Sequence, residues 1–118
     1  MKTDELYDNI RRTTGSANTQ DTEIAFLDAL KKVVSDINRM LGESITAPTQ
    51  ITSTDIGFED YCDNAFHPGV KFYMQRDGAW AQDPDAESFG FYRRALREAI
   101  GDAIAADTGF KTRNQASS

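Results

Sequence analysis

The clearest hydrophobic pattern of the chain lies between Thr22 and Gly42 and predicts one long amphipathic helix. Its apolar positions follow one another at intervals of three and four residues, which places them on one helix face; they are Leu27, Leu30, Val34, Ile37 and Leu41. Asp21 or Thr22 is the expected cap, and Gly42 stands where a left-handed residue ends a helix. A second set repeats every seven residues along the edge of this face: Phe26, Val33 and Met40. We expect this set to contact either a loop of the same chain or a neighbouring subunit.

Two shorter helices are predicted on either side of this one. The segment from Asp4 to Thr13 begins with acidic residues and ends with arginines, as the helix dipole favours, and Thr3 is its expected cap. Another helix is expected from near Phe58 to Gln75, capped by Asp55. Because proline lacks an amide donor and clashes with the preceding turn, Pro68 is expected to kink or restart this helix.

The last helix is predicted from about Asp85 to Ala106, with Pro84 suited to its first turn. Its apolar positions recur at helical spacing and are Phe89, Tyr92, Leu96, Ala99, Ile100, Ala103 and Ile104. Residues 43–56 are rich in Thr and Ser and contain a proline, which favours an extended connector. The predicted fold class is therefore all-α, a small bundle of about four helices with an extended Thr-rich connector and a polar C-terminal tail.

The predicted bundle is one domain, residues 1–106, and residues 107–118 form the tail. The tail has no core-forming pattern, yet Phe110 is followed closely by Lys111 and Arg113. An apolar anchor with neighbouring cations on an otherwise disordered segment is typical of a docking peptide that orders on binding. The alternative interpretation is a frayed terminus.

A chain of 118 residues has room for one modest core and often gains stability by oligomerising. The formal net charge of −6 argues against a protein whose main task is to grip nucleic acid, since phosphate contacts need Lys and Arg. The amino-terminal residues lack the apolar segment of a secretory signal, and no apolar stretch approaches the roughly 20 residues of a membrane span. We expect a soluble protein with no membrane partner.

The only cluster with ligand-like spacing consists of Glu59, Asp60, Asp63 and His67. On a continuous helix these side chains could bind a divalent metal, whereas the alternative is that acidic residues early in a helix offset its dipole. The single cysteine, Cys62, is five residues from His67, which places the two on different sides of a helix and argues against a nucleophile and base pair. We therefore expect no enzymatic activity, no metal and no cofactor.

Two further features suggest contacts with other proteins. Trp80, the sole tryptophan, lies in a predicted loop, where it is a candidate interface anchor or folds back over the helix ends. The last helix carries a basic cluster of Arg93, Arg94 and Arg97. For this cluster, a solvated face or pairing with an acidic neighbouring chain is favoured over contact with DNA.

The order of features in residues 26–106, about two-thirds of the chain, resembles the head-to-tail connector, or adaptor, proteins of tailed bacteriophages. The resemblance rests on the helix ending AFLDALKKVVSDINRMLG with the following connector containing ITSTDIGFEDY, on a short helical segment with GVKFYM, and on the late helix FYRRALREAIGDAIAA. Two features depart from the family pattern: Pro68 and Gly69 interrupt a helix expected to run smoothly, and the tail is short.

The resemblance implies a structural virion protein at the neck between capsid and tail, assembled in the host cytoplasm. Copies would form a ring, expected to be dodecameric, on the portal protein, and tail or stopper (nozzle) proteins would dock on it. The ring would extend the channel for genome ejection, and genomic DNA would pass an acidic wall without specific binding. The segment from Phe110 to Ser118 would contact the portal. The alternative function is a small helical binding or regulatory module, dimeric through Phe26, Val33 and Met40.

Overall fold

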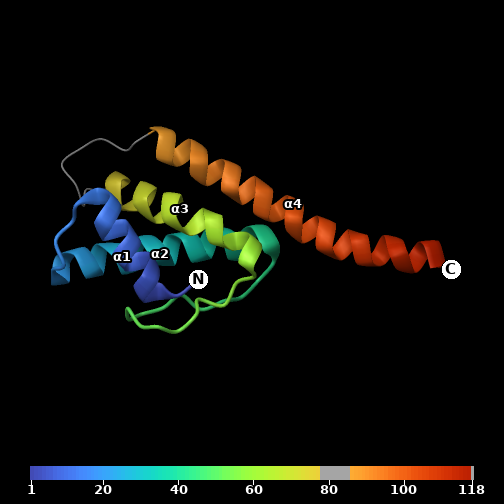
Figure 1. Cartoon of the computed structure of the whole chain (residues 1–118), viewed down its shortest axis with the longest axis horizontal. Coiled ribbons are helices and arrows are strands. Elements are labelled where there is room, and N and C mark those ends of the chain that lie inside the picture. The colour runs from blue at the N-terminus through green and yellow to red at the C-terminus, as the bar shows by residue number, and fades with distance from the viewer. Residues whose placement is uncertain (78–85, 118) are drawn as a thin grey trace.

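The computed structural model describes residues 1–77 and 86–117, with side chains described for residues 1–77 and 89–106. In these ranges the chain forms four α-helices, one short 3-10 helix and no strand, which confirms the predicted all-α fold. The elements are α1 (Thr3–Thr14), α2 (Gln20–Leu41), η1 (Asp60–Cys62), α3 (Asp63–Arg76) and α4 (Ala86–Ser117). Figure 1 shows α3 lying between α2 and α4, and one end of α4 extending well beyond the other helices.

The ends of α1 and α2 follow local chemistry, with small shifts from the sequence prediction. Thr19, not Asp21 or Thr22, caps α2, because its hydroxyl accepts a hydrogen bond from the Thr22 amide at 3.2 Å. Gly42 ends α2 as predicted, in the left-handed conformation with φ 68°, and its amide donates to the Asn38 carbonyl. Thr3 is not a cap: it is the first residue of α1 and is buried.

The connector after α2 is irregular, as predicted, and is fastened to the helices at both ends. The Asn38 side chain donates to the Ile45 carbonyl at 2.8 Å and accepts from the Ile45 amide at 3.0 Å. Near its other end Ile56 and Phe58 are buried, so the connector supplies part of the core. Asp55 accepts from the Gly57 amide at 2.9 Å and caps no helix, which corrects the prediction for this residue.

The helix does not restart at Pro68, since α3 runs without interruption from Asp63 to Arg76. The helix also begins later than expected near Phe58, after the 3-10 turn of η1. Proline in a helix removes one backbone hydrogen bond. Packing on both sides of it holds the helix together, because Phe66 and Val70 are fully buried.

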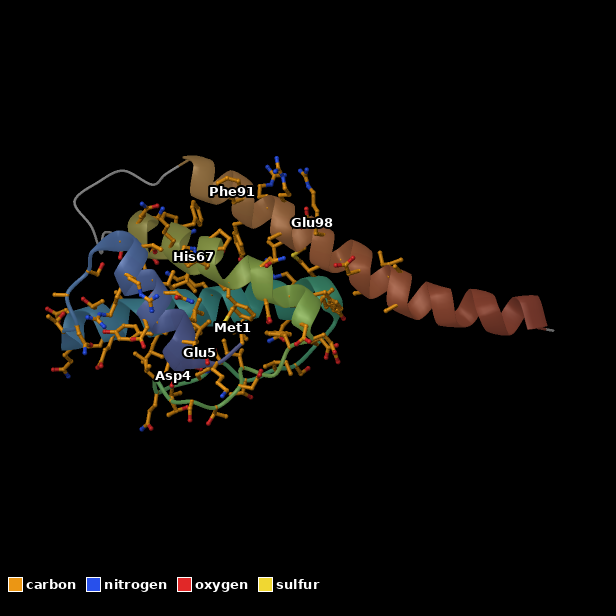
Figure 2. The ribbon with its side chains drawn as sticks, viewed as in Figure 1. Met1, Asp4, Glu5, His67, Phe91 and Glu98 are labelled. Atoms are coloured by element: carbon orange, nitrogen blue, oxygen red, sulfur yellow. The ribbon has the colours of Figure 1, made fainter. Side chains whose placement is uncertain are left out.

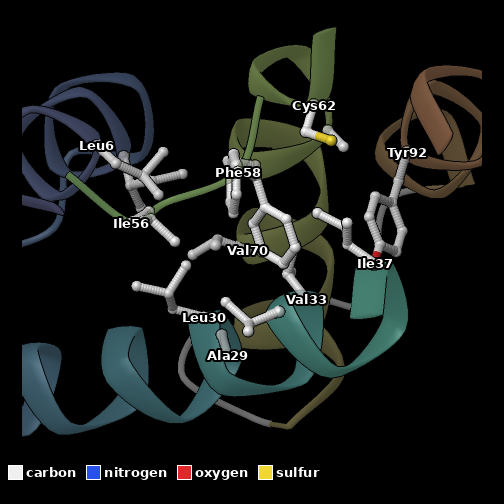
Figure 3. Packing of buried hydrophobic residues seen from close by; sticks show 14 of the residues in the cluster. Leu6, Ala29, Leu30, Val33, Ile37, Ile56, Phe58, Cys62, Val70 and Tyr92 are labelled. Atoms are coloured by element: carbon white, nitrogen blue, oxygen red, sulfur yellow. The ribbon is translucent and has the colours of Figure 1, made fainter. Parts of the chain in front are cut away.

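Side chains from every helix and from the connector meet in one core. Figure 3 shows Leu6 of α1, Phe58 of the connector and Tyr92 of α4 converging on the buried face of α2. That face is wider than the predicted stripe and consists of Phe26, Ala29, Leu30, Val33, Val34 and Ile37. Leu27 and Leu41, the first and last residues of the predicted stripe, are only partly buried. A helix covered by several neighbours needs a broad apolar face.

The prediction that the chain leaves its helix near Ala106 is wrong, because α4 continues to Ser117. Its 32 residues correspond to about 48 Å at 1.5 Å per residue. A formed helix grows without a new nucleation cost, so polar residues can extend it without a core pattern. Residues 107–117 are therefore helical, not an extended tail. None of the helices in the described ranges has the length and apolar character needed to cross a membrane.

Candidate protein-binding surface

The amino-terminal half of α4 is fixed to the body by an unusually close approach to α3. Gly69 of α3 lies against the ring of Tyr92, which is buried. A Cβ placed on Gly69 would be 2.5 Å from Tyr92 Cε1 and 2.9 Å from Val33 Cγ2. The residue after Pro68 must therefore be glycine for α2, α3 and α4 to meet at this distance. Tyr92, Ala95 and Ala99 form the buried side of α4.

A single carboxylate ties the same three helices together. Asp36 of α2 accepts hydrogen bonds from the hydroxyls of Tyr73 on α3 and Tyr92 on α4, the latter at 2.7 Å. Arg39 donates to its other oxygen at 3.3 Å. Burial, together with the bond to the Asp36 carboxylate, raises the pKa of Tyr73 to about 12 and also raises the pKa of Tyr92. This cluster fixes the rotation of α4, and so decides which of its residues face outward.

The outward side of α4 carries aromatic and basic side chains. Figure 2 shows Phe91 and Glu98 on this side, with His67 of α3 below them. Phe91 is 50% exposed, and it borders a shallow groove of about 340 Å³ between α3 and α4, lined also by Arg94 and Pro68. An exposed aromatic side chain beside an arginine is typical of protein interfaces.

A second aromatic group lies toward the start of α4. The ring centroids of Phe89 and Phe72 are 4.9 Å apart, and the guanidinium of Arg93 stands 5.6 Å from the Phe89 ring. Phe89 is 41% exposed, although the sequence placed it on the apolar face. Three aromatics at positions 89, 91 and 92 cannot all occupy one face of a helix. That spacing is the signal from which an exposed aromatic on α4 could have been predicted.

The carboxyl half of α4 leaves the body. Ile104 is 57% exposed, and its neighbours Ala105 and Ala106 are exposed as well. Figure 1 shows this half of the helix, in red, extending away from the other elements. An isolated helical segment of this length is marginal in water, and packing against a partner is the usual source of its stability.

An acidic surface lies where α4 leaves the body. Burial raises the pKa of Tyr61, and the carboxylates of Glu59, Glu43 and Asp102 raise it further. Burial and two of the same carboxylates, Glu43 and Glu59, also raise the pKa of Cys62 to about 11. Glu43 and Glu59 are exposed side chains. The electrostatics thus place a group of negative charges around η1.

The structure corrects part of the predicted interface. Phe26 and Val33 are fully buried within the chain's own core, Phe26 against Tyr7 of α1 at a ring distance of 5.1 Å. They contact helices of the same chain, where a loop or a neighbouring subunit was expected: Phe26 lies against α1 and Val33 against Gly69 of α3. They therefore present no surface to a neighbour. Met40 is the exception, with 38% of its surface exposed.

The other predicted interface residues fall where side chains are not described. Trp80 lies outside the described residues. The backbone of Phe110, Lys111 and Arg113 belongs to α4, and their side chains lie outside the described set. Their role in a docking contact stays a prediction, now for a helical segment.

The residues considered for catalysis or metal binding have other partners. Thr13 Oγ1 and His67 Nε2 share a hydrogen bond of 3.1 Å, so His67 links α3 to α1. Burial, with the charge of Lys71, lowers the pKa of His67 and keeps its ring neutral near pH 7. Cys62 is fully buried. Glu59, Asp60 and Asp63 form no group with His67 that could hold a metal ion within the described part of the chain.

Comparison with known proteins gives no family: no family model, no curated protein and no solved structure matches this chain.

Proposed function

We propose that the protein is a structural subunit of a viral neck, a head-to-tail adaptor that forms a ring on the portal and docks tail or stopper proteins. The observation that carries the proposal is the projecting half of α4. A small helical body holds the first half of this helix rigidly, and the second half extends beyond it with exposed apolar residues such as Ile104.

The way α4 is held suits a docking function. Gly69 fixes the distance between α3 and α4, and Asp36 fixes the rotation of α4 through Tyr73 and Tyr92. A rigidly oriented helix loses little conformational freedom when it enters a groove on a partner, so more of the contact energy contributes to affinity. The segment from Phe110 to Ser118, which the resemblance assigns to the portal contact, follows directly along this helix.

The alternative, a small dimeric regulator, loses its predicted contact surface. Two of the three residues expected at that dimer interface, Phe26 and Val33, are fully buried in the core. A dimer would have to use another face of the molecule.

The proposal is tested by mixing the purified chain with the portal protein of the same virus and measuring the mass by light scattering. A complex with several copies of the chain per portal is expected. A variant ending at Ala106 keeps every described contact of the body and should fold but lose the complex. Absence of a complex at every salt concentration, or equal binding by the shortened variant, contradicts the proposal.

A further inference from the structure

We infer that the arginine-rich outer face of α4 on one copy docks against the acidic surface around Tyr61 on the next copy. This inference rests on the proposed function and deepens it, because it names the two surfaces through which neighbouring subunits would touch.

The basic surface consists of Arg94 and Arg97, with Phe91 beside them. All three are exposed. Helical spacing places the two arginines on the side of α4 opposite its buried residues Tyr92, Ala95 and Ala99. The described carboxylates form no ion pair with Arg94 or Arg97. In a chain of net charge −6, two arginines without an ion pair to a described carboxylate, beside an exposed aromatic, are a distinctive surface.

The acidic surface lies in the longest stretch without a cationic side chain. From Met40 to Val70 the chain contains no Lys or Arg and five carboxylates: Glu43, Asp55, Glu59, Asp60 and Asp63. Glu43, Glu59 and Asp60 are exposed. Glu43 and Glu59 both raise the pKa of Tyr61 and of Cys62, so both carboxylates lie near η1. The partly buried ring of Tyr61 gives this surface an apolar centre.

The two surfaces cannot neutralise each other within one chain. η1 packs against the inner side of α4, whereas Arg94 and Arg97 lie on its outer side. A second copy can bring its arginines to the acidic surface and leave its own acidic surface free for a third copy. Such a contact between two different patches is heterologous and generates a ring when the rotation between copies closes.

Another copy of the chain fits the arginine face better than DNA does. The face carries Glu98 directly after Arg97, and the body behind it is acidic, so a phosphate backbone would meet repulsion around a small area of attraction. The acidic surface of another copy, with a few carboxylates around an aromatic ring, has the opposite charge to the arginine face. It is also similar to that face in size and in apolar character.

The inference is tested by reversing charges on the full chain. One variant carries Arg94→Glu with Arg97→Glu, and the other carries Glu43→Lys with Glu59→Lys; all four positions are exposed and away from the core. Self-association is measured by sedimentation at low salt up to the highest soluble concentration. Each variant alone should associate at least about tenfold more weakly than the natural chain, because like charges now meet. An equal mixture of the two should recover association, since both kinds of contact in an alternating assembly again join opposite charges.

Matched controls separate this contact from a general effect of net charge. Arg12→Glu with Lys31→Glu, and Glu5→Lys with Asp8→Lys, make the same charge changes at exposed positions elsewhere and should associate like the natural chain. The inference is overturned if the natural chain stays monomeric at all concentrations, if the reversed variants associate normally, or if the mixture fails to recover. Saturable binding of a DNA duplex that is lost in Arg94→Glu with Arg97→Glu would also overturn it.

The same variants distinguish this inference from the proposed function. If both reversed variants form a portal complex with the same mass as that of the natural chain, the inferred contact between neighbouring copies is wrong and the adaptor function stands. If the charge-swapped mixture assembles but no form of the chain binds the portal, the contact stands and the adaptor function is wrong.

Discussion

The ring of Tyr92 lies so close to Gly69 that the crossing of α3 and α4 leaves no room for a side chain at position 69. A Cβ atom there would come within 2.8 Å of Tyr92 Cδ1 and 2.5 Å of Cε1, closer than packed atoms tolerate. The position of α4, and with it the outer face and the projecting half of the helix, therefore depends on one glycine.

Gly69→Ala should destabilise the protein by about 1–3 kcal/mol, because the added methyl group must push apart Tyr92 and Val33 in a packed core. Urea unfolding followed by circular dichroism measures the change. Gly101→Ala is the matched control on α4, since nothing lies within 4 Å of a Cβ at that position. The control should stabilise the helix by about 0.5–1 kcal/mol, and equal behaviour of the two variants contradicts the close crossing.

Asp36→Ala should cost about 1–3 kcal/mol, because the hydroxyls of Tyr73 and Tyr92 lose their common acceptor in a partly buried position. The unfolding free energy in urea is again the measurement. Asp28→Ala provides the comparison on the same helix, since the interaction of Asp28 within the described residues is an exposed ion pair with Lys32. Its loss should cost no more than about 1 kcal/mol, and a cost equal to that of Asp36→Ala is incompatible with the role assigned to Asp36.

Stability should fall as the pH rises from 10 toward 12. Tyrosine in the unfolded chain loses its proton near pH 10, whereas the pKa of Tyr73 in the folded protein is raised to about 12 and that of Tyr92 is raised as well. In this window the unfolded chain binds fewer protons than the folded chain, so the free energy of unfolding decreases with pH. Urea unfolding at a series of pH values measures the slope. Tyr73→Phe should make the decline shallower, and an unchanged slope in that variant argues against the raised pKa.

Cys62 should react slowly with a thiol reagent in the folded protein. Its side chain is fully buried, and its pKa is raised to about 11, so the thiolate is much rarer than for an ordinary cysteine even before access is considered. The rate of colour development with a disulfide reagent, with and without urea, measures this. Rapid reaction of the native protein would show that the region around η1 opens, in conflict with the packing described.

The all-α fold could be predicted because several of its signals are local. Gly42 marks the end of α2 by its conformation alone, and the Thr-rich connector excludes a regular helix by its composition. The heptad spacing of Phe26 and Val33 was also visible, but it does not tell which neighbour covers them. Their burial within the chain depends on α1, α3 and α4 all lying over α2, which is a tertiary property.

The features that orient α4 could not be predicted in the same way. Gly69 follows a proline, and a Pro-Gly pair in a sequence is typical of a helix break. In the structure, however, the absence of a side chain at Gly69 makes room for the ring of Tyr92. In the sequence, Asp36 is one of several polar residues on α2. Its role becomes apparent only in the fold, which brings Tyr73 and Tyr92 to it from distant positions in the chain. The length of α4 was underestimated because helix propagation beyond Ala106 needs no apolar pattern.

The most direct test of the central claim is an electron-microscopic reconstruction of the portal protein mixed with this chain. The account predicts an added ring of small helical bodies coaxial with the portal channel, with the carboxyl half of α4 of each copy entering the portal. A portal without added density, or a ring in which the projecting half of α4 points away from the portal, would contradict it.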